Sequence, residues 1–267
     1  MIRPRFFLFR DCDEMVTGKK TILAFLILAL AGLSAVVPAR AQSADTSDGW
    51  TFQVMPYFWA TGIKAITKAP IGPEKTVELS FSDILESMHF GAMGSFEGRK
   101  GRWGFLFDGG YADIRKSVSV PQIGGDVESK MPTTTLSLVA TGRVVQGKAV
   151  LELLAGPRYN WAKTDLEVTS GPLAGRGHSS TDSWWDAIAG VRLFVPLAKS
   201  WRFLGYADVG GGGSELTWQA RGAVAWRFSN LLSAEAGYRH FYFERVNKSV
   251  STKQTKSGFY LGLGIWF

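Results

Sequence analysis

Apolar and polar residues alternate through most of this chain. Trp103 and Phe105, for example, share one face of their segment, while Asp108 lies on the other face. A repeat of two residues is typical of a β-strand with one apolar face. The pattern predicts ten strands, at about 49–60, 88–99, 102–114, 131–145, 149–162, 183–195, 201–211, 216–229, 231–243 and 257–267.

The connections between these segments alternate between short and long. The short ones are 100–101, 146–148, 196–200 and 229–230, and the longer ones are 61–87, 115–130, 163–182, 212–215 and 244–256. Short turns on one side and longer loops on the other are the plan of a transmembrane β-barrel. If 201–211 and 216–229 did not pair, the strand count would fall to eight.

Charged residues within the strands keep to the face opposite the apolar one. They are Glu97, Arg99, Asp108, Arg143, Glu152, Arg158, Asp186, Arg192, Arg202, Asp208, Arg221, Arg227, Glu235 and Arg239. Every basic residue among them is arginine, which suits enclosed, bidentate pairing with carboxylates. A soluble sandwich would show water a charged face rich in lysine and glutamate instead. We therefore expect an all-β protein, a closed antiparallel transmembrane β-barrel with lipid outside and a charged lumen.

The start of the chain predicts a secretory signal peptide. Two adjacent lysines precede the apolar stretch 21–37, and Ala39 and Ala41 fit a small-residue cleavage site. Met15 is an alternative start that would give a signal of usual length. The expected organisation is a signal peptide (1–41), a short periplasmic leader (42–48) and the barrel (49–267).

Composition narrows the function classes once that signal is removed. The single cysteine, Cys12, lies in the signal, so the exported part has none. The net charge of +7 falls to +4, because 24 basic and 20 acidic residues remain after residue 41. A modest positive charge spread along the chain is not the basic patch of a nucleic-acid-binding protein. No apolar stretch after the signal reaches the roughly 18 residues that a transmembrane helix needs.

The final strand carries a resemblance to a known group. Its apolar residues fall at every second position, at Phe259, Leu261, Leu263, Ile265 and Phe267. This ending resembles that of the bacterial outer-membrane β-barrel superfamily, whose members typically finish on an aromatic residue. The resemblance implies recognition of this strand by the barrel-assembly machinery, an outer-membrane location and contact with outer-membrane lipid and lipopolysaccharide. The segments 97–108, 81–85 and 207–211 look like patterns in uncharacterised small outer-membrane barrels, which bring no known activity with them.

The charged residues of the lumen allow two interpretations of its function. Its residues could line a narrow pore for small solutes, or they could plug and rigidify the barrel. Barrels of about eight strands have an interior just filled by side chains, whereas porins with an aqueous channel use about 16–18 strands. The size therefore favours a largely plugged, monomeric barrel that serves as a structural or interaction protein of the envelope, with the pore as the alternative.

An enzyme at the outer rim, a protease or a lipid A-modifying enzyme, is a second alternative. His240 has Glu244 beyond it, and Asp83 and Glu86 precede His89. A general base would need a carboxylate and a nucleophile or water within hydrogen-bond reach. The Asp-x-His pair of the ten-stranded barrel proteases is absent, and no His-x-Ser pair of the deacylase kind begins at His240, where the sequence is His-Phe-Tyr. His240 also falls on the lipid-facing parity. We therefore expect no catalytic residues.

Two other motifs have simpler explanations than ligand binding. The glycines at 210–213 have no helix after them, so they predict a tight hairpin and not a phosphate-binding loop. The segment 82–87 could form one helical turn capped by Ser80 or Ser82. We expect no cofactor, and no metal site, since no residues have metal-ligand spacing.

Overall fold

The computed structural model describes residues 49–120, 124–247 and 249–267. One antiparallel sheet contains nearly all of them. Its strands are β1 (Thr51–Lys68), β2 (Lys75–Leu79), β3 (Met88–Lys100), β4 (Trp103–Val120), β5 (Gly125–Gln146), β6 (Val150–Val168), β7 (Gly177–Ala198), β8 (Trp201–Gly212), β9 (Leu216–Arg227), β10 (Leu232–Asn247) and β11 (Val250–Trp266). The predicted signal peptide, its cleavage alanines and the leader lie outside the described residues. Within the described ranges, no helix is both long and apolar enough to cross a membrane.

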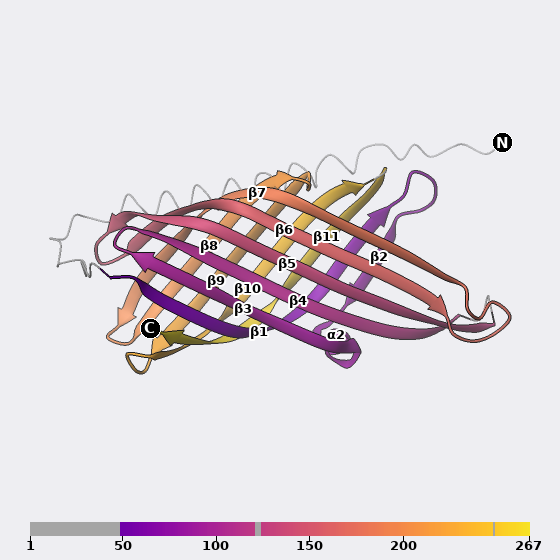
Figure 1. Ribbon diagram of the computed structural model, residues 1–267, viewed down its shortest axis with the longest axis horizontal. Helices are drawn as coiled ribbons and strands as arrows, with labels where there is room; N and C mark the ends of the chain where they lie inside the picture. Colours follow the sequence, from indigo (N-terminus) through magenta and orange to yellow (C-terminus); the bar gives the residue numbers. More distant parts are fainter. Residues whose placement is uncertain (1–48, 121–123, 248) are drawn as a thin grey trace, which may run out of the picture. The chain divides into compact units, whose positions relative to one another are not determined.

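β11 closes the sheet into a barrel by pairing with β1 (Figure 1). The closure begins where Phe52 and Phe267 exchange backbone hydrogen bonds of 2.8 and 3.0 Å. Ten strands form the ring, and β2 is an extra strand that pairs only with β1. The predicted ten-stranded antiparallel barrel is confirmed. The eight-stranded alternative is wrong, because β8 and β9 remain paired as far as Gly210 and Thr217.

The strands run further at one end of the barrel than the apolar alternation predicted. β4 and β5 stay paired through Arg115 and Lys130 up to Val120 and Gly125. The expected loops 115–130, 163–182 and 244–256 are therefore mostly strand, and 61–87 contains the end of β1, β2 and a helix. The predicted strand ends were wrong because polar residues occupy both faces there, so the apolar alternation stops. The backbone groups still pair. This end is termed the outer end, and the other the short-turn end.

A short helix, α2 (Phe81–Ser87), joins β2 to β3. Ser80 caps its start, as one of the two predicted options had it. The Ser80 hydroxyl accepts from the backbone N–H of Asp83 at 3.2 Å, and the Asp83 carboxylate accepts from the backbone N–H of Ser80 at 2.9 Å. This reciprocal capping box satisfies two backbone donors that a helix otherwise leaves unpaired.

The two faces of the wall differ sharply in exposure. Along β11, Phe259 is 72% exposed and the next residue, Tyr260, only 4%. Trp103 and Trp185 stand out from the wall toward opposite ends, as the aromatic girdles of a membrane barrel do. So extensive an apolar exterior would be a liability in water, and lipid is its natural solvent.

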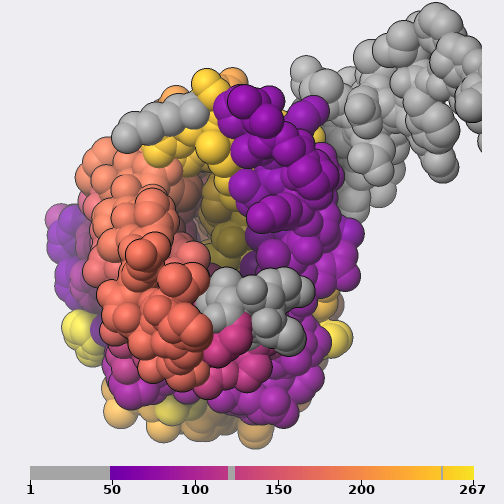
Figure 2. Space-filling view, turned by 90° about the vertical axis from the view of Figure 1, so that its right-hand side faces the viewer, coloured from indigo at the N-terminus to yellow at the C-terminus, as the bar shows by residue number. Residues whose placement is uncertain are grey.

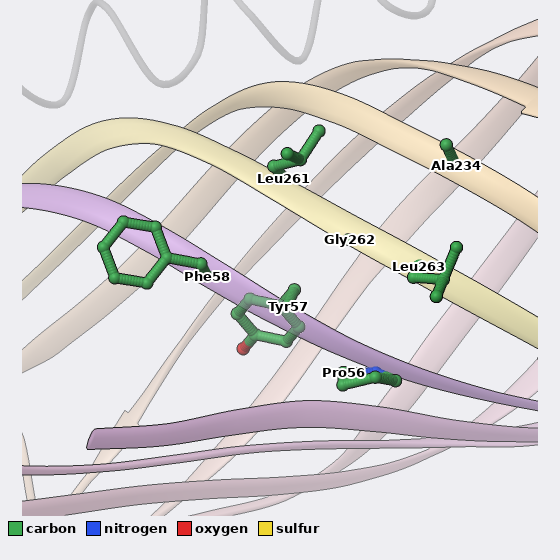
Figure 3. A pocket seen from close by; sticks show the side chains of 7 residues that line it. All are labelled: Pro56, Tyr57, Phe58, Ala234, Leu261, Gly262 and Leu263. Atoms are coloured by element: carbon green, nitrogen blue, oxygen red, sulfur yellow. The ribbon is translucent and has the colours of Figure 1, made fainter. Parts of the chain in front are cut away.

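A shallow recess lies on the outer surface at the seam between β1 and β11 (Figure 3). Pro56 has no N–H to give to the ladder, and the β1–β11 pairing is interrupted between Val54 and Tyr57. The recess measures about 370 Å³, and Phe58 and Leu261 lie beside it. Because these apolar side chains belong to the lipid-facing set, the recess faces the membrane and not the lumen.

Candidate functional site

The inner wall of the barrel carries the charged residues that the alternation placed opposite the apolar face. Eight are buried (Glu152, Arg158, Asp186, Arg192, Asp208, Arg221, Glu235 and Arg239), five are half-buried (Glu97, Arg99, Asp108, Arg143 and Arg202), and Arg227 is exposed. Arg227 lies at the short-turn end, where its guanidinium donates to the carbonyl of Asn230 at 2.7 Å. The remaining charges form clusters at three levels of the lumen.

Arg192 is the centre of the cluster nearest the short-turn end. Its guanidinium donates to both carboxylate oxygens of Glu97, each at 2.8 Å, and to Glu152 at 2.6 and 2.9 Å. Arg99 pairs with the same two carboxylates at 2.8 and 2.6 Å, and Arg143 reaches Glu152 at 3.3 Å. These five residues are termed the lower cluster.

The lower cluster spans the lumen from one side of the wall to the other. Glu97 lies on β3 and Arg192 on β7, and three strands, β4, β5 and β6, separate them in the ring. The Arg192 guanidinium also lies 4.8 Å from the centre of the Phe194 ring, on whose ring Arg202 packs at 5.4 Å. Removing so many charges from water is costly, and the cost is offset only where each charge is well paired. The pairing is therefore what holds large side chains across this level.

A second group, the central cluster, links Asp108, Arg158, Asp208, Gln219 and Arg239. Asp108 accepts from Arg239 at 2.9 Å, and Asp208 accepts from Arg158 at 2.6 Å. Gln219 joins the two ion pairs, because its amide donates to Asp208 at 3.2 Å and its carbonyl accepts from Arg239 at 2.8 Å. Five strands, β4, β6, β8, β9 and β10, contribute to this group and so hold it across the barrel.

Arg221 departs from the expected arginine–carboxylate pairing. Its guanidinium lies between two phenol rings, 5.3 Å from the centre of Tyr206 and 5.6 Å from that of Tyr260. No described carboxylate forms an ion pair with it, and the nearby Glu235 accepts instead from the Tyr260 hydroxyl at 2.5 Å. The expectation was wrong here because it ignored inward aromatic rings, whose faces attract cations.

The third level lies toward the outer end. No arginine in the described part of the chain pairs with Asp186, which accepts instead from the backbone N–H of Ser214 at 2.6 Å and from the Asn160 amide at 3.2 Å. An ion pair that the sequence analysis missed lies nearby, where Arg245 donates to both carboxylate oxygens of Asp182 at 2.6 and 2.8 Å. Both residues were assigned to loops. The alternation could have revealed Arg245, because it continues the inward parity of β10.

The glycine run 210–213 ends β8 and leads into the predicted tight turn to β9. Gly212 has a φ of +136°, a conformation that favours glycine. The backbone N–H of Gly213 donates to the carbonyl of Trp185 at 2.8 Å, so it is used within the wall. The residues that the structure describes contain no group of three or more His, Cys, Asp or Glu side chains placed to hold a metal ion.

His240, the strongest candidate for a rim enzyme, lies on the outer surface. It stacks on the Trp218 ring with 4.6 Å between centres, and its Nδ1 is 2.7 Å from the Ser257 hydroxyl. Glu244 does not complete a triad, because it pairs with Lys253 at 3.7 Å. The structure thus brings a serine to this histidine without the carboxylate that would orient the ring.

Comparison with known proteins defines the class of fold. No protein-family model matches the sequence, and no curated protein matches it either. The chain is similar in structure to the outer membrane protease OmpT of Escherichia coli, with a TM-score of 0.58 and 6% identity over 85% of this chain and 99% of that one. It also matches the translocator domain of the autotransporter NalP of Neisseria meningitidis (TM-score 0.41, 14% identity, 95% of this chain, 97% of that one) and Ail of Yersinia pestis (TM-score 0.34, 12% identity, 82% and 99%).

The chain therefore has the fold of the bacterial outer-membrane β-barrels. The resemblance indicated by its final strand is confirmed at the level of fold. With the exposed apolar belt, this is the architecture of an integral outer-membrane protein. The protease activity belongs to OmpT, and an identity of 6% transfers only the fold.

Proposed function

We propose that this protein is an outer-membrane barrel whose lumen is closed by its own side chains, and that it serves the envelope as a structural and interaction protein. The lower cluster carries the proposal. Arg192 on β7 is bonded both to Glu152 on the adjacent strand β6 and to Glu97 on β3, from the other side of the wall. A solute crossing this level would have to separate buried ion pairs, and breaking such a pair by removing one partner costs about 3–5 kcal/mol.

The size of the barrel supports the same function. A barrel of about eight strands has an interior that side chains just fill, while aqueous porins need about 16–18. Ten strands add some room, and buried arginines and aromatic rings such as Arg158, Arg192 and Tyr206 occupy it. The central cluster forms a further obstacle above the lower one.

The outer end of the barrel and its lipid-facing belt support the interaction role. The extended ends of β4 to β7 stand clear of the apolar belt and offer an edge to other envelope components. The belt itself would contact outer-membrane lipid and lipopolysaccharide, with the protein acting as a monomer. The last strand, ending at Phe267, keeps its proposed role as the signal for the barrel-assembly machinery.

A non-enzymatic role is part of this proposal. The Ser257–His240 pair faces lipid, and its histidine is held by Trp218. If outer-membrane vesicles containing the protein hydrolysed lipid A or a peptide, and His240→Ala abolished that turnover while the barrel still folded, the rim-enzyme alternative would replace ours.

Planar-bilayer recording of the refolded protein tests the closed lumen. We expect no steady conductance steps from the wild-type barrel. Steady channels whose ion preference changes in Arg143→Glu or Arg221→Glu would show an open, charge-lined path and would establish the narrow pore instead. Heat-dependent migration on gels should verify that each variant is folded.

A further inference from the structure

The wall of the barrel has a gap in its hydrogen bonding between β1 and β3. The two strands pair only from Thr51 with Arg99 to Pro56 with Gly94. Beyond this point β1 pairs with β2, from Ile63 onward, and the start of β3 pairs only with β4. Residues 57–62 and 88–93 therefore face each other without a ladder. This opening is termed the window.

Helix α2 lies across the window. At one side, the Phe81 ring packs edge-on against the outward Phe58 ring, with 6.0 Å between centres. At the other, Ile84 is only 2% exposed and faces the interior. Open sheet edges at membrane depth occur where protein or a water-filled cavity covers them. Helix α2, and not a strand, thus covers the window.

Behind α2 lies a cavity of about 70 Å³ in the outer half of the lumen. Figure 2 shows the hollow at the outer end, between the strands in indigo and those in orange. The floor is the Arg239–Asp108 ion pair, to which the Tyr57 hydroxyl is bonded. The walls are mostly apolar, with Trp59, Ile84, Met88, Met93, Ile114 and Phe241. The cavity has the composition of a ligand site, apolar with a few convergent polar groups.

Lys256 lines this cavity, and it is a lysine where the inward basic residues of the lower and central clusters are arginines. It faces the interior between its cross-strand neighbours Ile63 and Phe241. No described carboxylate pairs with it, and Asp108, the carboxylate that lines the cavity, is bonded to Arg239 and Tyr57. Lys256 is half-buried, and an ammonium ion partly removed from water beside apolar walls is stabilised by an accompanying anion. The cavity therefore has one cation more than its own residues neutralise.

We propose that this cavity binds the anionic head group of a single-chain amphiphile, such as a fatty acid. Lys256 pairs with the head group, and the apolar chain leaves through the window by passing beside α2. The volume supports this division, because the cavity of about 70 Å³ is less than half of the roughly 150 Å³ of an apolar cavity that holds benzene. A carboxylate fits within that space and an alkyl chain does not. Outside the window, Leu85 and Phe90 are 52% and 57% exposed and offer the chain an apolar path.

Equilibrium dialysis of the barrel in phosphatidylcholine nanodiscs, with labelled dodecanoate as the probe, tests this site. We expect saturable binding above that of empty nanodiscs, with one site per barrel. Lys256→Met should weaken the affinity by about tenfold or more, because a charge-assisted contact is lost, while Lys256→Arg should retain binding. Lys253→Met is the matched control on the same strand, since Lys253 pairs with Glu244 outside the cavity, and its affinity should match the wild type.

Three further measurements examine the head group, the chain and the window separately. Dodecanol lacks the charge and should not show the saturable site, and acetate lacks the chain and should bind far more weakly than dodecanoate. Ile84→Trp fills the cavity and should abolish binding although Lys256 is intact. Equal dodecanoate binding by wild type and Lys256→Met would overturn the proposal, as would acetate binding as tightly as dodecanoate. The site lies on the outer side of the lower cluster, so these results do not depend on whether the barrel conducts.

Discussion

Arg192 is the residue on which the lower cluster depends. It bonds two carboxylates at once, and Glu152, one of them, is completely buried. A buried carboxylate that loses its partner keeps the cost of desolvation without the compensating attraction. The arginine thus matters more for what it neutralises than for the space it fills.

Replacing this arginine should destabilise the barrel strongly. We expect Arg192→Leu to lower the free energy of unfolding by about 3–5 kcal/mol, since it leaves Glu97 and Glu152 with fewer partners. Urea unfolding of the refolded protein, followed by tryptophan fluorescence, measures this. Arg227→Gln is the control and should change stability by less than about 0.5 kcal/mol, because Arg227 is exposed. Equal losses in both variants would contradict the account of the cluster.

The contact of Arg221 with its two phenol rings makes a separate prediction. A double-mutant cycle of Arg221→Met and Tyr260→Leu should give a coupling free energy of about 0.5–2 kcal/mol, the range of a cation–π contact. The same urea titration supplies the four stabilities. Additive effects would show that the rings merely surround the guanidinium without stabilising it.

At this scale the sequence determines the face of a residue but not its partner. The strict alternation of side chains along a β-strand predicted the side of the wall on which Glu97 and Arg192 lie. Their pairing depends on the stagger of strands that lie far apart in the chain, which no local pattern contains. Arg221 shows the same limit, since its neighbours Tyr206 and Tyr260 come from two other strands.

Helix α2 is the element that distinguishes this barrel from a simple ring of strands. A helical turn capped by Ser80 or Ser82 followed from local chemistry, because serine side chains favour a helix start; the structure has the cap at Ser80. The position of α2 across the window did not follow, since that depends on where the β1–β3 pairing ends. β2 was missed because a five-residue polar strand has too short a pattern to detect.

The capping box makes the stability of α2 depend on pH. Hydrogen bonds from the hydroxyl and backbone N–H of Ser80 lower the pKa of the Asp83 carboxyl below its ordinary value of 3.8. A lowered folded-state pKa means that the stabilisation is complete above the unfolded-state value and is lost as the pH falls through the folded-state value. The hydrogen-exchange protection factors of residues 81–87, which divide out the pH dependence of the intrinsic exchange rate, should therefore be constant from neutral pH down to about pH 5 and fall only below about pH 4.

Asp83→Asn should remove this dependence. In that variant α2 should open more readily at neutral pH, and acid should change its opening little. Glu86→Gln, in the same helix but outside the capping box, is the control and should keep the wild-type profile. If wild type and Asp83→Asn exchanged alike at every pH, the capping box would not be what holds α2.

The whole molecule is a closed ring because its first and last strands share one pattern. Val54 and Ile265 face lipid from opposite ends of the chain, and their strands pair in one register. The fold class, the strand number and the two faces were predictable, since each follows from a local repeat of two. The extent of the strands beyond the membrane was not, because a polar strand and a polar loop look alike in sequence.

The closed lumen is the central claim, and single-channel recording with two kinds of variant tests it most directly. One variant, Arg192→Ala with Arg239→Ala, removes one central arginine from each cluster: Arg192 from the lower cluster and Arg239 from the central cluster. The other deletes residues 169–176 at the outer end and leaves both clusters intact. We expect silent bilayers from the wild type and from the shortened barrel, and steady conductance from the arginine variant. Conductance by the wild type, or by the shortened barrel alone, would contradict closure by the lumen side chains.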